Sequence, residues 1–342
     1  MGDRRRRGEG SCLGGPCRSC VFAVQVASTR RNSRFGGRTR IRLAGHRDHC
    51  YLFGGRAGER GGGTRERSID MGAPPRGHGR AIGRPGAPFV STPKGTTMYF
   101  TSERHLDDGV LERGFTLGEI PGILWTPASA PAPTPLILMG HPPLGLHKMY
   151  SRLAGRARYY TAEYGFAAAT IELPGSGDRP RWAAVEQARA DLRGAMEAGE
   201  PVGDEIVDAL VLPLVEKAVP EWRATLDALL SLPEIGGPVG YEGGVISIGI
   251  RLAVVEPRIV AAGFFAGSLV PAAMFDEARR VTIPLQVLLQ WDDEGNDRQA
   301  ALDLFDAFGS QEKTLHANLG GHTGVPRFEL EAGARFFARH LT

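Results

Sequence analysis

The sequence predicts an α/β fold over residues 98–342, with a mostly parallel sheet covered by helices on both faces. Short continuous apolar runs alternate along this part of the chain with longer segments of helical periodicity. That order is typical of buried parallel strands joined by crossover helices. Segments rich in glycine, proline and aspartate separate the two kinds of element. No apolar run approaches the roughly 20 residues that span a bilayer, so the sequence predicts no membrane-spanning segment.

Each expected element rests on its own pattern. Residues 113–126 alternate around an Ile-Pro-Gly turn, which predicts a β-hairpin. Short apolar runs predict buried strands at 135–140, 166–172, 238–241, 259–265, 284–290 and 313–318. Helical periodicity predicts helices at 148–164, 248–255, 297–309 and 326–341. The segment 181–232 is helical in pattern with a break at 199–203, and because it is long for a crossover, we expect residues about 180–222 to form a cap over a site.

Residues 1–97 have a different composition. Residues 1–95 hold 20 basic against 6 acidic side chains, whereas the remainder holds 21 against 32, so the net charge of +3 describes neither part. Large aliphatic residues are sparse here, and we expect a disordered Arg/Gly-rich extension. One interpretation is that translation starts near Met98. Others are a nucleic-acid-binding tract, an organellar transit peptide, or a zinc site formed by Cys12, Cys17, Cys20, His46, His49 and Cys50.

All four cysteines lie in this extension, so the predicted fold contains none. A disulfide-stapled secreted scaffold is therefore excluded, and a cytoplasmic location is the default expectation.

Three candidate catalytic points come in the order hydroxyl, acid, histidine. Ser247 lies in a glycine-rich turn between an expected strand and helix, Asp292-Asp293 follows a later strand, and His322 follows the last one. Ligands of such sheets bind beyond the carboxyl ends of the strands. A serine hydroxyl that attacks a carbonyl needs a base to take its proton and a carboxylate to orient that base. The order therefore predicts a Ser-His-Asp arrangement.

Six segments carry a family resemblance: Leu136-Ile-Leu-Met-Gly-His141, Ile171-Glu-Leu-Pro-Gly-Ser-Gly-Asp-Arg179, Val239-Gly-Tyr241, Glu256-Pro-Arg-Ile259, Gln290-Trp-Asp-Asp-Glu294 and Gly320-Gly-His322. In order and spacing the chain from Met98 onward resembles the α/β-hydrolase superfamily, in its dienelactone-hydrolase/acyl-peptidase-like branch. The resemblance implies that His322 is the catalytic base and Asp293 the acid, with Asp292 as the alternative. It also implies a serine hydrolase that cleaves an ester, a lactone or a small amide.

The nucleophile turn departs from the family pattern. Relatives show Gly-Tyr, one residue, then Gly-x-Ser-x-Gly, whereas this chain has Gly240-Tyr-Glu-Gly-Gly-Val-Ile-Ser-Ile-Gly249. Counting forward places the nucleophile slot on Val245, and counting back from Glu256 places it near Gly243. Ser247 is the only hydroxyl residue in the turn and is our candidate nucleophile. The alternative role for this serine is a helix N-cap.

The loop after the first buried strand also departs from the pattern. Relatives tend to have His-Gly-Gly-Gly, and this chain has His141-Pro-Pro-Leu-Gly145. Proline has no N–H to donate. The expected oxyanion donors are therefore the amides of Leu144 or Gly145, together with that of Ile248.

The expected partner is a small-molecule acyl substrate. The expected pocket residues are His141, Trp182, Leu212 and Trp222, although the last three could instead pack the cap against the core. No motif predicts a metal, nucleotide or organic cofactor, because the glycine-rich turns lack the Lys and Ser/Thr of a phosphate-binding loop. Two other functions stay open: acid–base chemistry without a covalent step, as in a lyase or isomerase, and ligand binding without catalysis.

Overall fold

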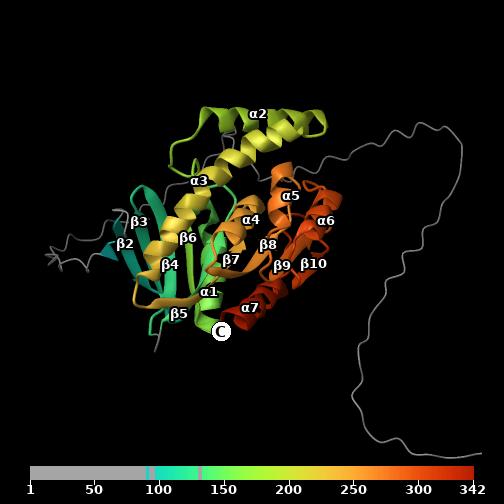
Figure 1. The fold of residues 1–342 in the computed structure, drawn as a ribbon. Coiled ribbons are helices and arrows are strands. Elements are labelled where there is room, and N and C mark those ends of the chain that lie inside the picture. The colour runs from blue at the N-terminus through green and yellow to red at the C-terminus, as the bar shows by residue number, and fades with distance from the viewer. Residues whose placement is uncertain (1–89, 92–96, 130–132) are drawn as a thin grey trace, which may run out of the picture. The chain divides into compact units, whose positions relative to one another are not determined.

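The computed structural model describes residues 90–91, 97–129 and 133–342, and these residues build a single mixed sheet (Figure 1). The described strands run in the order β1-β2-β3-β4-β6-β5-β7-β8-β9-β10. From β6 to β10 neighbouring strands are parallel, whereas β1 to β4 and the β4–β6 pair are antiparallel. The bounds are β1 Val90–Ser91, β2 Thr97–His105, β3 Val110–Leu117, β4 Ile120–Pro127, β5 Thr134–Gly140, β6 Ala167–Ile171, β7 Ile235–Gly243, β8 Ile259–Phe265, β9 Leu285–Gln290 and β10 Lys313–Asn318.

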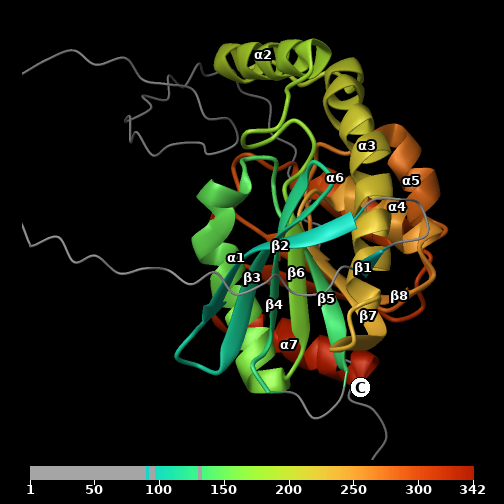
Figure 2. The same cartoon turned by 90° about the vertical axis from the view of Figure 1, so that its left-hand side faces the viewer.

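Helices cover both faces of this sheet, as the sequence predicts. The bounds are α1 Leu146–Tyr164, α2 Ala183–Ala198, α3 Asp204–Leu230, α4 Ile246–Val255, α5 Ala272–Ala278, α6 Arg298–Ala307 and α7 Phe328–Leu341. Helices α1 and α7 pack together on one face, and α3, α4, α5 and α6 lie side by side on the other (Figure 2). Each face has its own apolar core, because every second strand residue points to it. The predicted fold class is therefore confirmed.

The antiparallel edge of the sheet corrects one prediction. The predicted hairpin exists, but its turn is at Gly118-Glu119 and not at the Ile-Pro-Gly sequence. Pro121 and Gly122 lie inside β4, paired with Thr116 and Phe115. Gly118 has a φ of 59°, a conformation that glycine adopts without steric cost. The turn therefore forms at the glycine with positive φ and leaves the proline in an extended strand.

The helical segment after β6 is split where the sequence breaks. Helix α2 ends at Gly199, which has a φ of 68°, and α3 begins at Asp204. Helix α3 is 27 residues long, and its second half packs on the sheet through Trp222 and Leu226. Figure 1 shows α2 apart from the sheet, in contact with the first part of α3.

The expectations for the N-terminal extension lie outside the described residues, apart from positions 90, 91 and 97. Val90 pairs with Met98 and Ser91 with Thr97, so the described sheet includes residues on both sides of the expected boundary at Met98. Among the described residues no helix has the length and apolar character to cross a membrane.

Candidate active site

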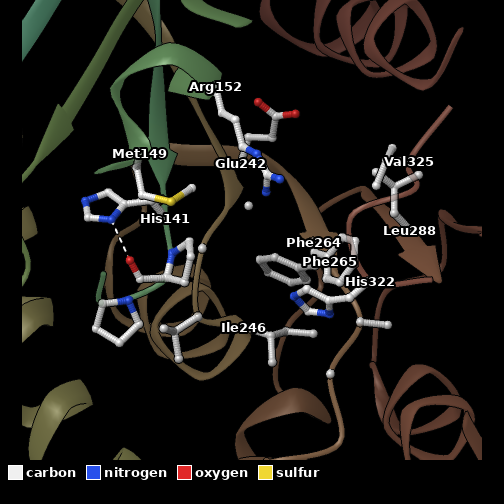
Figure 3. Close-up of a pocket in the computed structure, with 18 of the residues that line it drawn as sticks. His141, Met149, Arg152, Glu242, Ile246, Phe264, Phe265, Leu288, His322 and Val325 are labelled. Atoms are coloured by element: carbon white, nitrogen blue, oxygen red, sulfur yellow. Dashed lines mark hydrogen bonds between the residues drawn. The ribbon is translucent and has the colours of Figure 1, made fainter. Parts of the chain in front are cut away.

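A cavity of about 690 Å³ lies at the carboxyl ends of the parallel strands. The last residues of β5, β7 and β8, which are Gly140, Gly243 and Phe265, all line it. This is where ligands bind in open α/β sheets. Figure 3 shows His322 beside Phe264 and Phe265, with Arg152 and Glu242 on another side of the same cavity.

His322 and Asp293 come together as the sequence predicts. The two side chains share a hydrogen bond of 2.7 Å between Nδ1 of His322 and Oδ2 of Asp293. Asp293 is buried, its side chain only 3% exposed, whereas that of His322 is 52% exposed and lines the cavity. The other carboxylate oxygen of Asp293 accepts from the Gly295 amide at 3.1 Å. Asp292 is exposed and makes no hydrogen bond to His322.

This geometry fixes how the imidazole can act. Because Nδ1 donates to a carboxylate, Nε2 is left as the proton acceptor of a neutral ring. The ring of Phe265 stands edge-on to the imidazole, with centroids 5.2 Å apart, and supports its orientation. A histidine held this way, at a cavity and next to a buried carboxylate, has the arrangement of a general base.

Ser247 does not join this pair. It is the second residue of α4, fully buried, and its Oγ has no hydrogen-bond partner among the described residues. Its neighbours Val245 and Ile246 line the cavity, but Ser247 does not. The expected hydrogen bond to His322 is not formed, and Ser247 is not the N-cap either, because Val245 occupies that position.

Two glycines at the end of β7 explain this displacement. Gly243 and Gly244 have φ values of 73° and 76°, and α4 begins only at Ile246. The chain turns at these glycines, so the first two positions of the turn carry no side chain. The letters Gly240-Tyr-Glu242-Gly-Gly244 also fit a nucleophile pattern with a carboxylate at its centre. However, Glu242 is still within β7, paired with Met139 and Gly263.

Two of the three expected oxyanion donors are engaged elsewhere. The Leu144 amide donates to the carbonyl of Pro142 at 2.7 Å, and that of Ile248 donates to Val245 at 3.0 Å. Leu144, Gly145 and Ile248 do not line the cavity, whereas Pro142 and Pro143 do. The expected amide pair is therefore not formed.

His141 lines the cavity but is fixed to the backbone. Its Nε2 lies 2.9 Å from the carbonyl of Ile171, and its Nδ1 lies 2.8 Å from that of Pro142, the contact drawn in Figure 3. Burial lowers the pKa of His141, and the two carbonyls oppose that effect. The neutral ring donates to one carbonyl at a time, so His141 ties the proline loop to the end of β6.

Of the other expected pocket residues, one lines the cavity and two do not. Trp182 lines the cavity, and Lys217 lies over its ring at 4.5 Å from the centroid. Leu212 and Trp222 do not line the cavity. Trp222 is fully buried and packs edge-on against Tyr241, with centroids 6.0 Å apart. Leu212 is partly buried and packs against the same apolar core, so for these two residues the structure shows packing.

Several charged residues of the cavity are absent from the sequence-based candidates, and two of them meet at the strand ends. Arg156 of α1 reaches the ends of β5 and β7, and Glu242 of β7 accepts a hydrogen bond of 2.8 Å from Tyr160. The spacing of Arg152, Arg156 and Tyr160 places them on one helical face, which was the available signal. The described residues contain no group of three or more His, Cys, Asp or Glu side chains able to hold a metal ion.

Comparisons with known proteins agree with the fold. No family model matches the chain, and no curated protein matches it. A solved structure of a cold-adapted esterase from an Arctic intertidal metagenomic library is 26% identical, covering 71% of this chain and 98% of its own, with a TM-score of 0.52. An acetyl xylan esterase from Paenibacillus sp. R4 is 14% identical, covering 72% of this chain and 90% of its own, also with a TM-score of 0.52.

The fold of the described residues is the α/β-hydrolase fold. Its parallel strands, two helical layers and cavity at the strand ends are those expected from the sequence resemblance. The His322–Asp293 pair occupies the loops after β10 and β9, where the resemblance places it.

Proposed function

We propose that the protein is a carboxylic ester hydrolase in which His322, oriented by Asp293, activates water directly. The 2.7 Å hydrogen bond between the two side chains at the cavity carries this proposal. The similarity to a solved esterase at 26% identity supports the choice of an ester as substrate.

The nucleophile is water because the turn after β7 offers none. Ser247 is buried inside α4, and the residues at the tip of the turn are Gly243, Gly244 and Val245. The hydroxyl residues that line the cavity are Ser151, Ser268 and Thr323. None of them hydrogen bonds to His322 within the described part of the chain.

The reaction then runs in two steps. Nε2 of His322 takes a proton from water while the water oxygen forms a bond to the acyl carbon, and the carbonyl electron pair moves onto oxygen. The pair then returns, the bond to the alcohol oxygen breaks, and the imidazolium gives its proton to that oxygen. The products are a carboxylic acid and an alcohol, with no ester formed on the protein.

Two variants test this proposal against an acyl-enzyme on Ser247. We expect His322→Gln to lower kcat for p-nitrophenyl butyrate by about 10²–10⁴-fold, the usual contribution of a positioned general base. Ser247→Ala should leave kcat within about twofold of the wild type, because the hydroxyl has no partner and does not reach the cavity. Kinetics of the purified variants measure both.

A fluorophosphonate probe gives the matching control. The wild type should remain unlabelled, because such probes need an activated serine. Labelling that Ser247→Ala abolishes, together with loss of hydrolysis in that variant, would overturn the proposal in favour of an acyl-enzyme.

A second candidate function uses the same pair on a different bond. A histidine base with no hydroxyl nucleophile beside it can also remove a proton from carbon, as in a lyase or isomerase. The side-chain-free turn at Gly243 and Gly244 is the observation that favours it. Incorporation of solvent deuterium into recovered substrate, without release of acid, identifies this alternative.

A further inference from the structure

The guanidinium of Arg156 lies beside the carboxyl ends of the neighbouring strands β5 and β7. Its Nη2 donates to the carbonyl of Gly140 at 3.4 Å, and its Nη1 is 3.6 Å from Oε2 of Glu242. Both distances exceed the 2.7–2.9 Å of a tight charge-assisted hydrogen bond. A guanidinium has five N–H donors, so most of those on Arg156 are not used in short contacts within the described residues.

The absence of a side chain on Gly243 leaves room for this guanidinium. A Cβ placed on Gly243 would stand 3.1 Å from Nη1 of Arg156, and its φ of 73° disfavours any other residue. Arg156, Gly243, Gly244 and His322 all line the same cavity. A ligand at the turn therefore meets the cation of Arg156 and the base of His322 in one space.

A partly buried carboxylate and a buried tyrosine stand beside Arg156. Glu242 is only 14% exposed and faces the guanidinium with Oε2, while its Oε1 accepts from the Tyr160 hydroxyl at 2.8 Å. Tyr160 is fully buried, and burial together with the charge of Glu242 raises its pKa well above the usual value. Its hydroxyl therefore stays protonated and fixes Glu242. The cation is thus positioned before a substrate arrives.

Four of the backbone positions around the site offer it no donor. Pro142 and Pro143 have no N–H, and the amides of Leu144 and Ile248 are bonded to carbonyls. Hydrolysis of an ester places a full negative charge on the carbonyl oxygen of the intermediate. A preorganised donor aimed at that oxygen is among the largest contributions to such catalysis.

We propose that Arg156 is a catalytic residue that holds the oxygen on which this negative charge develops. The inference rests on the proposed function. It adds to the general base His322 a second group, which stabilises the negative charge on the carbonyl oxygen. As water adds to the acyl carbon, the carbonyl electron pair moves to oxygen, and the Arg156 N–H groups donate to it. When the bond to the alcohol oxygen breaks, the charge leaves that oxygen and the contact weakens. Glu242 is the positioning residue for this guanidinium.

Steady-state kinetics test the role. We expect Arg156→Gln to lower kcat by about 10²–10³-fold with KM changed less than about threefold, because the charge develops in the transition state and the intermediate and is absent from the bound ester. Arg158→Gln is the matched control: it removes a guanidinium from the same helix, where Arg158 pairs with Asp108 at 2.6 Å on the surface. That variant should keep the kinetics of the wild type.

Chemical rescue separates charge from structure. Arg156→Ala should regain at least about tenfold in kcat when guanidinium chloride is added at non-denaturing concentration, relative to sodium chloride of equal ionic strength. Circular dichroism should show both variants folded. A raised KM with unchanged kcat, or no rescue in a folded variant, overturns the proposal.

Binding without turnover separates this inference from the proposed function. Calorimetry with a phosphonate monoester, an anionic mimic of the intermediate, should show at least about tenfold weaker binding to Arg156→Gln than to the wild type. The affinity of His322→Gln for the phosphonate should be within about threefold of that of the wild type. If binding of the phosphonate depends on Arg156 but the protein hydrolyses no ester, the proposed function fails and the anion-binding role of Arg156 stands. Equal binding by wild type and Arg156→Gln refutes the inference itself.

Discussion

At the residue scale, the site depends on one contact that forms and one that does not. Nδ1 of His322 meets the buried carboxylate of Asp293 at 2.7 Å, whereas the hydroxyl of Ser247 is enclosed in α4 with no partner. The first contact leaves Nε2 free to take a proton at the cavity. The second observation removes the nucleophile that the sequence suggests.

The two neighbouring aspartates provide a matched prediction. Asp293→Asn should lower kcat for ester hydrolysis by about 10²–10⁴-fold with KM little changed, because an amide no longer fixes the imidazole tautomer or stabilises its cation. Asp292→Asn should keep the kinetics of the wild type, because Asp292 is exposed and does not contact His322. Parallel assays measure both, and equal losses in the two variants would contradict this assignment.

These residues also show what sequence can predict. His322 and Asp293 each follow a recognisable strand, and the order of strands in such a fold brings their loops together. Ser247 is the only hydroxyl residue in its turn, which makes it the sequence's candidate, but the register of a turn depends on backbone dihedrals that the sequence does not specify. Arg156 lies in α1, far from Gly243 in the sequence, and its approach to Gly243 depends on tertiary packing.

At the element scale, the connection from β7 to α4 determines the shape of the site. Gly243 and Gly244 both adopt positive φ, and Gly244 lies against the end of β5. A Cβ on Gly244 would stand 2.8 Å from Cα of Gly140 and 2.9 Å from the amide nitrogen of His141. The close approach of these two backbones requires glycine.

Alanine at this glycine tests that requirement. Gly244→Ala should lower the free energy of unfolding by about 2–4 kcal/mol, because left-handed strain and backbone overlap add together. Gly194→Ala in α2, where a Cβ meets nothing within 4 Å, should be neutral or stabilising by about 0.5–1 kcal/mol. Urea unfolding compares the two. A stable Gly244→Ala variant would show that the turn differs from the one described.

The other end of α4 is joined to its neighbours by a buried carboxylate. Glu256 accepts hydrogen bonds from Arg258 at 2.6 and 2.7 Å and from Arg223 of α3 at 3.2 Å. These contacts, led by that with Arg258, lower the pKa of Glu256 from 4.5 to about 2. A folded pKa below the unfolded value stabilises the fold above about pH 4.5, and this stability is lost as the pH falls toward 2.

This linkage predicts a pH-dependent loss in one variant. Glu256→Gln should reduce the free energy of unfolding at pH 7 by about 2–3 kcal/mol, and the difference from the wild type should shrink between pH 5 and pH 3. Glu216→Gln is the control, because Glu216 is 66% exposed and its pairing with Arg251 is on the surface. Urea titrations at pH 7, 5 and 3 measure the trend, and a difference that grows on acidification is the contrary result.

At the scale of the whole molecule, the alternation of strands and helices was enough to predict the fold. Six predicted buried strands and the helices between them appear with ends shifted by a few residues. The antiparallel edge was harder, because β2 and the true turn of the β3–β4 hairpin depend on pairing between exposed strands. Helix α5 had no distinct signal, since it is only seven residues long.

The whole molecule brings the base, the cation and the cap to one cavity. Residues of α1, β7, the loop after β10 and the segment from Trp182 to Leu214 line the same space. An ester that enters it meets His322 and Arg156 but no hydroxyl at the turn. Under the proposed function, hydrolysis there proceeds without a covalent intermediate on Ser247.

Intact-mass spectrometry during turnover shows whether hydrolysis passes through an ester on the protein. Wild-type protein is mixed with excess p-nitrophenyl butyrate and quenched in acid while hydrolysis continues, with His322→Gln treated in parallel. We expect steady release of acid by the wild type but not by His322→Gln, and a wild-type chain of unmodified mass throughout. A butyryl group on the peptide that contains Ser247, or hydrolysis that is equal in His322→Gln, would contradict it.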